Sequence, residues 1–237
     1  IKEKSSISKL KEFFKEENNN LKKQNNYTLK LSFQNEENKK LIKKIIKDNF
    51  QDTLDELQKY YNANIYLTNV ELKKTFHIDK HDLDEEHFNN FFHIDSYLRT
   101  HFKIFVNVSD IKLSNGPTEI YDISKTKKIR KFNSFNKERG KLEIPESIES
   151  YLNIGNAGEV LLCNTSLCLH RATNPSLENS RENLILTFVA YPNDTNNIYY
   201  YEKKDPDSIW TQKNFITKLL AKPKGYKDVF LLSKKFF

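Results

Sequence analysis

The feature that most constrains the fold of this chain is a change of hydrophobic periodicity near Ala63. Before it, between Asn35 and Asn62, apolar residues recur at spacings of three and four and share one face of an expected helix. These apolar residues are Leu41, Ile42, Ile45, Ile46, Phe50, Leu54, Leu57 and Tyr61. After Ala63 the chain breaks into short β-rich runs separated by Asn-Gly, Gly-Asn and Asn-Pro pairs. The sequence therefore predicts a mainly β protein with flanking helices.

The β-rich part has the strand lengths and turn signals of a sandwich or jelly roll. The expected strands cover residues 65–68, 102–108, 118–121, 160–163, 167–170 and 183–191. We expect residues 63–237 to form this domain, with residues 1–62 as a helical segment that packs on it in a single structural unit. Within that segment, residues 1–25 are expected to form a polar helix. A further packing helix is expected near the C-terminus, around Trp210, Phe215, Leu219 and Leu220.

The net charge of +7 raises the question of nucleic-acid binding, and its distribution argues against it. Residues 1–50 carry 13 basic and 7 acidic side chains, whereas residues 51–100 carry 5 basic and 10 acidic ones. The N-terminal excess is nearly all Lys, mixed with Glu and Asn in a helical pattern, without a compact Arg cluster. A solvated lysine-rich surface explains it better than a phosphate-binding face, so a nucleic-acid partner is not expected.

The cysteine content and the hydropathy bear on the cellular compartment. The two cysteines, Cys163 and Cys168, fall in one short β-type run and make no disulfide framework, which fits a reducing interior. No apolar run approaches the roughly 18 residues of a membrane span, because the longest, residues 184–191, has the length of a strand. We expect a cytoplasmic protein without a membrane partner; its oligomeric state is not indicated.

Candidate metal ligands stand in two segments far apart in the sequence. His93 and Asp95 are two residues apart just before an expected strand, so an extended chain directs both side chains to one side. His170 ends another expected strand and supplies a second imidazole. Two imidazoles and one carboxylate on one face of a metal are diagnostic of non-haem Fe(II) oxygenases. Each residue alone is equally well explained by a structural role; the combination is what favours a metal site.

A candidate anion-binding residue follows the second histidine. Arg181 lies eleven residues after His170, at the head of the apolar strand that runs to Tyr191. A guanidinium that enters the interior of a barrel needs an anionic partner, and a carboxylate receives it as a bidentate pair. We therefore expect Arg181 to bind a carboxylate.

These motifs together resemble the phytanoyl-CoA dioxygenase family of Fe(II)/2-oxoglutarate-dependent oxygenases. The resemblance rests on His93-Ile94-Asp95, on the downstream Asp110 and Asn115-Gly116-Pro117, and on the segment from His170 through Asn174 to Arg181, and it covers roughly residues 64–191. It implies a double-stranded β-helix (jelly-roll, cupin-like) core. It further implies that His93, Asp95 and His170 bind Fe(II), that Arg181 grips the distal carboxylate of the cosubstrate 2-oxoglutarate, and that O2 is the oxidant.

The chain departs from the pattern of that family at several positions. After Pro117 it reads Glu119-Ile120-Tyr121-Asp122 in place of the family's Pro-Gly-Ser-His turn. Ile94 stands where a Gln often holds the cosubstrate, and Ala172 where a hydroxyl is frequent; Thr173 and Lys103 are candidates to replace these contacts. Asp95 is retained, whereas the halogenating branch of the family has lost this carboxylate, so hydroxylation is favoured.

A second His-x-Asp, His77-Ile78-Asp79, competes for the same role. An acidic polar run follows it instead of a strand, and the downstream Asn-Gly-Pro is lacking at the right spacing. A solvated loop is the preferred interpretation; a mobile loop over the entrance or an accidental cation site are the alternatives. His101 is expected at the surface, on a strand edge.

The sequence thus predicts an Fe(II)- and 2-oxoglutarate-dependent dioxygenase that hydroxylates an unidentified small organic molecule. Two other classes stay open. One is an oxygenase that acts on nucleic acid or protein, and the other is a jelly-roll binding protein without turnover.

Overall fold

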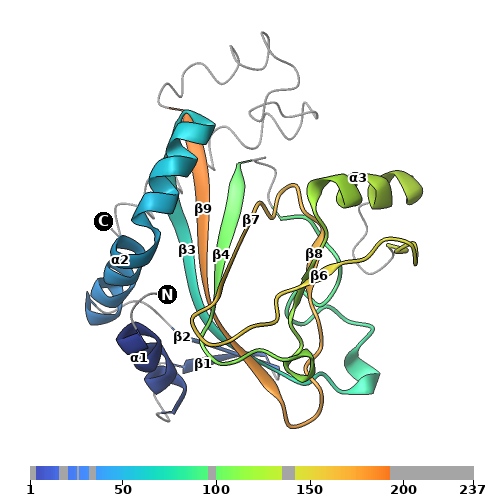
Figure 1. Cartoon of the computed structure of the whole chain (residues 1–237). Helices are drawn as coiled ribbons and strands as arrows, with labels where there is room; N and C mark the ends of the chain where they lie inside the picture. The colour runs from blue at the N-terminus through green and yellow to red at the C-terminus, as the bar shows by residue number, and fades with distance from the viewer. Residues whose placement is uncertain are drawn as a thin grey trace.

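The computed structural model describes residues 4–15, 21–25, 27–31, 36–95, 100–134 and 142–192, and it contains helices on the outside of two antiparallel sheets (Figure 1). The α-helices are α1 (Lys4–Lys15), α2 (Glu36–Tyr61) and α3 (Ile123–Phe132), with short 3-10 turns at Lys80–Asp82 and Leu113–Asn115. Within these ranges, none of the helices has the length and hydropathy of a membrane span.

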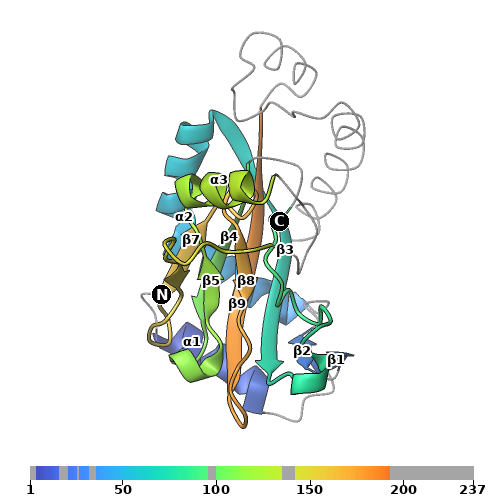
Figure 2. The same ribbon diagram turned by 90° about the vertical axis from the view of Figure 1, so that its right-hand side faces the viewer.

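The larger sheet has six strands in the order β1-β2-β3-β9-β4-β7, all paired antiparallel. Two long strands, β3 (Ala63–Phe76) and β9 (Ser180–Pro192), form its centre and pair along their whole length. The other four strands are β1 (Leu21–Asn25), β2 (Thr28–Leu31), β4 (His101–Asn107) and β7 (Val160–Cys163). Figure 2 shows β3, β9 and β4 side by side in this sheet.

The smaller sheet has three short strands in the order β6-β5-β8 and lies across from the larger one (Figure 1). Its strands are β5 (Thr118–Ile120), β6 (Tyr151–Leu152) and β8 (His170–Ala172). β5 pairs antiparallel with both β6 and β8. Because β8 begins at His170, this sheet fixes the backbone of a candidate ligand.

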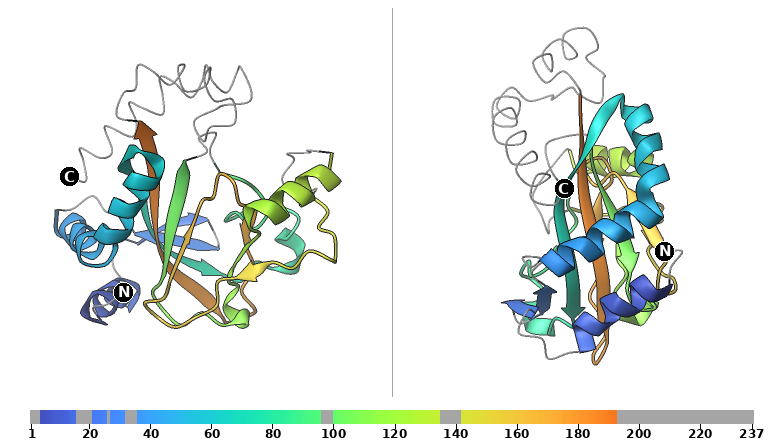
Figure 3. Two further views of the ribbon diagram at one scale, coloured as in Figure 1. Left: turned by 45° about the horizontal axis from the view of Figure 1, so that its top comes forward. Right: turned by 90° about the vertical axis from the view of Figure 1, so that its left-hand side faces the viewer.

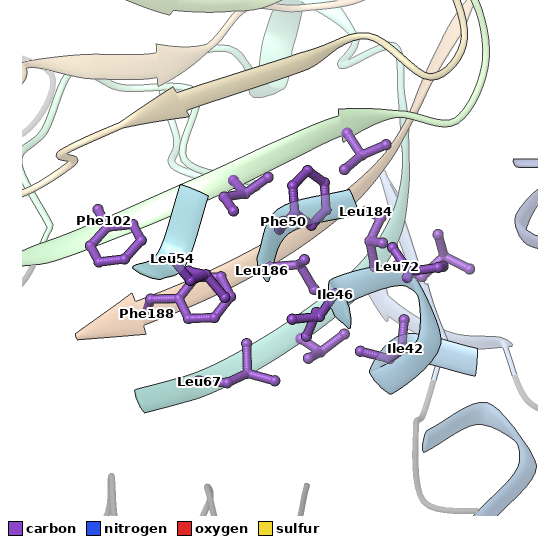
Figure 4. Close-up of a cluster of buried hydrophobic side chains, with 14 of the residues drawn as sticks. Ile42, Ile46, Phe50, Leu54, Leu67, Leu72, Phe102, Leu184, Leu186 and Phe188 are labelled. Carbon is purple, nitrogen blue, oxygen red and sulfur yellow. The ribbon is translucent and has the colours of Figure 1, made fainter. Parts of the chain in front are cut away.

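The hydrophobic core lies on the outer face of the larger sheet, beneath α1 and α2 (Figure 3). Alternate residues of β4 and β9, such as Phe102, Leu186 and Phe188, point toward α2, where they meet Ile46 and Leu54 (Figure 4). Burial of such side chains contributes about 1.5–3 kcal/mol each, which explains the apolar stripe of α2.

The opposite face of the same sheet is polar although it is largely buried. Lys73 and Thr75 of β3, and Arg181, Asn183 and Thr187 of β9, are all less than one-tenth exposed. Buried polar groups require partners, so an interior face of this composition is typical of a binding cavity and not of a packed core.

The structure confirms a mainly antiparallel β protein with flanking helices, and it corrects several element boundaries. The expected helix over residues 1–25 is wrong for residues 21–25, which form β1. The strand expected over 65–68 extends to Phe76, and residues 167–169 are not part of a strand, so that β8 starts only at His170. The expected C-terminal helix around Trp210 lies outside the described residues.

The segment Asn115-Gly116-Pro117 contacts both the start of β9, in the larger sheet, and the segment that follows β8, in the smaller sheet. The side-chain amide of Asn115 donates to the Ser180 carbonyl (2.9 Å), at the start of β9. Gly116 has φ +66°, and a Cβ at this position would lie 2.4 Å from the backbone nitrogen of Pro175 and 2.5 Å from the Thr173 carbonyl oxygen. Only glycine permits both this backbone conformation and this close approach.

Replacement of Gly116 by Ala should therefore lower the free energy of unfolding by at least about 2 kcal/mol, measured by chemical denaturation. Gly155→Ala is the matched control, because a Cβ there meets mainly the flexible end of the Glu159 side chain. That control should stay within about 0.5 kcal/mol of the wild type. Equal effects of the two substitutions would contradict this account of Gly116.

Candidate metal centre

A reciprocal pair of backbone hydrogen bonds brings the two candidate histidines together. The His93 amide donates to the His170 carbonyl and the His170 amide donates to the His93 carbonyl, both at 3.0 Å. His93 is thus held in an isolated β-bridge outside the named strands. The two imidazole rings lie with their centroids 4.3 Å apart.

The residues that precede these histidines are anchored in one small apolar cluster. Phe92 and Leu169 are both buried there, together with Tyr121 and Ile129. The Leu169 amide also donates to the buried Thr126 hydroxyl (2.9 Å). Because the neighbours of both histidines pack in the same cluster, the positions of the two imidazoles are fixed relative to each other.

Each imidazole is oriented by a backbone carbonyl two residues earlier. His93 Nδ1 lies 2.8 Å from the Phe91 carbonyl oxygen, and His170 Nδ1 lies 2.9 Å from the Cys168 carbonyl oxygen. This geometry assigns the proton of each ring to Nδ1, which leaves both Nε2 atoms as lone-pair donors. Such a contact is the usual way in which proteins hold a metal-binding histidine in one tautomer.

Asp95 completes a group of three ligand atoms. Its Oδ1 lies 3.5 Å from His93 Nε2 and its Oδ2 lies 3.6 Å from His170 Nε2. One ligand atom from each of the three residues falls within 4.8 Å of the others, and no other group of His, Cys, Asp and Glu in the described ranges meets this criterion. The Asp95 amide donates to the Thr165 carbonyl (3.0 Å), which fixes this end of the loop.

Lys103, on β4, lies beside the same carboxylate. Its Nζ is 2.5 Å from Asp95 Oδ2, and both side chains are about 15% exposed. Burial alone would raise the pKa of Asp95, but the His93 imidazole and the Lys103 ammonium outweigh it and hold the pKa well below its ordinary value. Burial lowers the pKa of His170 to about 3, so this imidazole is neutral at physiological pH. A neutral imidazole and an ionised carboxylate are the forms that bind metals.

Arg181 is a buried cation without an acidic partner. Its side chain donates one hydrogen bond, from Nη1 to the Thr173 carbonyl (3.2 Å), and no carboxylate of the described residues pairs with it. Burial lowers its pKa to about 10, which still leaves the guanidinium charged. A charge in this environment is costly unless an anion joins it.

His93, His170 and Arg181 border one cavity between the two sheets, with a volume of about 330 Å³. His101 also lines it, so the expectation of a surface position for this residue is wrong. β4 is an interior strand and directs alternate side chains inward, and burial lowers the pKa of His101 to about 4. The Thr173 hydroxyl, one candidate for a ligand contact, donates to the Pro117 carbonyl (2.7 Å) instead.

The second His-x-Asp is tied into the structure away from this cluster. His77 Nδ1 lies 2.7 Å from the Pro175 carbonyl oxygen, and the side-chain amide of Asn174 bonds both backbone groups of Ile78 (2.8 and 2.9 Å). Ile78 is fully buried. The preferred interpretation as a plain solvated loop is therefore wrong for His77 and Ile78, which anchor the end of β3 to the segment after β8.

Two features of this cavity were not predicted from the sequence. The carbonyl groups that orient the imidazoles belong to the backbone, so their position does not depend on residue type and cannot be inferred from it. Lys73 is a second buried cation in the cavity. Its neighbour Lys74 interrupts the alternation of polar and apolar residues along β3, and the expected strand ended at Thr68, so the sequence did not indicate that Lys73 is buried.

Comparison with solved structures finds chains of similar fold. The chain is similar to SnoN from nogalamycin biosynthesis, a non-heme alpha ketoglutarate-dependent epimerase, with a TM-score of 0.53 and 8% identity over 79% of this chain and 74% of that one. It is also similar to HygX from Streptomyces hygroscopicus, solved with nickel, 2-oxoglutarate and hygromycin B, with a TM-score of 0.50 and 11% identity over 81% and 80% of the chains. At these identities the likeness establishes the fold alone. No family model and no curated protein sequence matches the chain.

Proposed function

We propose that this chain is an Fe(II)- and 2-oxoglutarate-dependent dioxygenase that hydroxylates a small organic molecule, with His93, Asp95 and His170 as the iron ligands. The observation that carries the proposal is the convergence of two Nε2 atoms and one carboxylate beside a cavity that also holds the Arg181 guanidinium, which pairs with no acid of the described residues. In the same proposal, the two sheets are the halves of a double-stranded β-helix, as the likeness to SnoN and HygX supports.

The residues at the centre fit such a metal ion. His93 Nε2 is buried and has no hydrogen-bond partner among the described residues, which is costly unless a further group binds it. The set of two imidazoles and one carboxylate suits Fe(II) and leaves other coordination positions open. When iron, 2-oxoglutarate and O2 are bound, they supply the oxidation of a C–H bond.

The protein's own contribution is binding and orientation. The carbonyls of Phe91 and Cys168 hold the imidazoles in the ligating tautomer. Arg181 binds the distal carboxylate of 2-oxoglutarate as a bidentate pair, which fixes the direction of the cosubstrate in the cavity.

Three observations support the finer parts of the proposal. A cavity of about 330 Å³ has the size of a small-molecule site, and hygromycin B in HygX is a small-molecule ligand of a similar fold. Retention of Asp95 favours hydroxylation over halogenation, because the carboxylate occupies the position that a halide would need. The free cysteines Cys163 and Cys168 suit the reducing conditions of the cytoplasm, where we place the protein.

The iron assignment is tested with His170→Ala. Loss of one of three protein ligands should abolish both Fe(II) retention, measured after anaerobic desalting, and iron-dependent formation of succinate from 2-oxoglutarate. His77→Ala is the matched control from the other His-x-Asp and should keep the full iron content. Full iron content in His170→Ala, or an empty site in His77→Ala alone, would refute the ligand assignment.

The cosubstrate assignment is tested with Arg181→Ala, loaded with Fe(II) without oxygen and titrated with 2-oxoglutarate. Charge-assisted hydrogen bonds contribute roughly 1.5–3 kcal/mol, so the affinity should fall at least about tenfold. Arg181→Lys should recover only part of it, because an ammonium lacks the fork geometry. Iron affinity should stay unchanged. Wild-type affinity for 2-oxoglutarate in Arg181→Ala would show that another basic residue has this role.

A further inference from the structure

A second cation lies beside Arg181 on the same face of the larger sheet. In the register of β3 and β9, Thr75 is opposite Arg181 and Lys73 is opposite Asn183. Lys73 and Arg181 are therefore diagonal neighbours on adjacent strands, a relation that puts backbone positions roughly 7–8 Å apart and long side chains within reach of each other. Both are less than one-tenth exposed, and both line the cavity.

Lys73 has no acidic partner of its own among the residues that the structure describes. The nearest acid along β3 is Glu71, but Glu71 Oε1 already accepts hydrogen bonds from Lys30 Nζ (3.0 Å) and from the Asn69 amide (3.1 Å). Lys73 Nζ lies 5.9 Å from the centre of the Phe88 ring and makes no hydrogen bond or ion pair with the described residues. The side chain is thus a buried ammonium that faces an open cavity.

The electrostatic surroundings of Lys73 favour an additional negative charge. Burial lowers its pKa to about 8; Glu71 opposes this shift, and the positive charges of Arg181, Lys30 and Lys103 reinforce it. These four residues are the charged groups that act on Lys73 from β3, β9, β2 and β4. Two buried cations that lie close together repel each other, and each has lost hydration without gaining an acidic partner. An anion bound between them offsets both the repulsion and the cost of desolvation.

We propose that Lys73 is a specificity-determining residue of the cosubstrate site and that its ammonium group binds the distal carboxylate of 2-oxoglutarate together with Arg181. This inference rests on the proposed function. A carboxylate offers about four lone-pair positions on its two oxygens, so a guanidinium fork and an ammonium can bind it at the same time. Lys73 is assigned to this end of the cavity because its register places it next to Arg181, whereas Lys103 is engaged with Asp95.

A site with two cations should discriminate strongly between 2-oxo acids. 2-Oxoglutarate carries a second carboxylate, and 2-oxobutanoate presents the same keto-acid end to the metal without it. Lys73 should therefore strengthen the binding of the first acid and leave that of the second unchanged. This difference separates a contact at the distal carboxylate from a general effect of positive charge or of folding.

The test compares the wild type with Lys73→Met, each loaded with Ni(II), by calorimetric titration with the two acids. Lys73→Met should weaken the binding of 2-oxoglutarate at least about tenfold and change that of 2-oxobutanoate less than about twofold. Lys74→Met is the matched control, because the neighbouring Lys74 pairs with Glu182 (2.7 Å) and does not line the cavity. It should leave both affinities unchanged. Lys73→Gln repeats the test with a polar side chain in case Lys73→Met does not fold.

Proton uptake gives a second readout that does not depend on turnover. A neighbouring carboxylate raises the pKa of an ammonium group, so binding of 2-oxoglutarate near pH 8 should draw a fraction of a proton onto Lys73. Titrations in two buffers with different ionisation enthalpies measure this uptake. It should be present in the wild type and in Lys74→Met and lost in Lys73→Met and Lys73→Gln.

The outcomes distinguish the inference from the proposed function. If the Ni(II)-loaded wild type binds neither acid, the proposed function fails and the inference fails with it. If the wild type binds 2-oxoglutarate and the Lys73 variants bind it equally well, only the inference is overturned. Equal weakening of both acids overturns it too, because Lys73 would then act on the keto-acid end or on the fold.

Discussion

The reciprocal hydrogen bonds between the backbones of His93 and His170 are the constraint on which the candidate centre depends. They join a loop before β4 to the start of β8, two segments that are far apart in the sequence. The apolar cluster that holds Phe92 and Leu169 supports both sides of this bridge. Because backbone groups make this contact, the Nε2 atoms of the two histidines remain available for a ligand. The carbonyls of Phe91 and Cys168 set the orientation of the rings, so no other side chain is needed for it.

The charged side chains in and beside the cavity fall into two groups, according to whether they have a partner of opposite charge. Asp95, the only acid of the candidate ligand set, is paired with Lys103, whereas Lys73 and Arg181 face the cavity with no acid of their own in the described ranges. Lys103, Lys73 and Arg181 thus serve two purposes at different places along the strands. One stabilises the ionised state of a candidate ligand, and the other two create a region of positive potential in a low-dielectric space, where an anion is bound most strongly.

The sequence was informative where a single local pattern determines the outcome. The apolar stripe from Leu41 to Tyr61 specified α2 almost to the residue, because helix periodicity is a property of one segment. The three candidate ligands were brought together as expected, although through an isolated bridge instead of a strand. Lys73 was missed because lysine is normally solvated, and its burial follows only from the pairing of β3 with β9. His101 was misplaced for the same reason: its exposure depends on which strands flank β4, a long-range fact.

The larger sheet places the packing of the core and the lining of the cavity on opposite faces. Its outer face, with Leu186 and Phe188, supplies the packing against α2, and its inner face, with Lys73 and Arg181, supplies the lining of the cavity. Successive residues of one strand therefore have different roles, because one packs against α2 and the next lines the cavity. Substitutions at the inward positions therefore change the lining of the cavity directly, whereas they leave in place the apolar contacts between the outer face and α2.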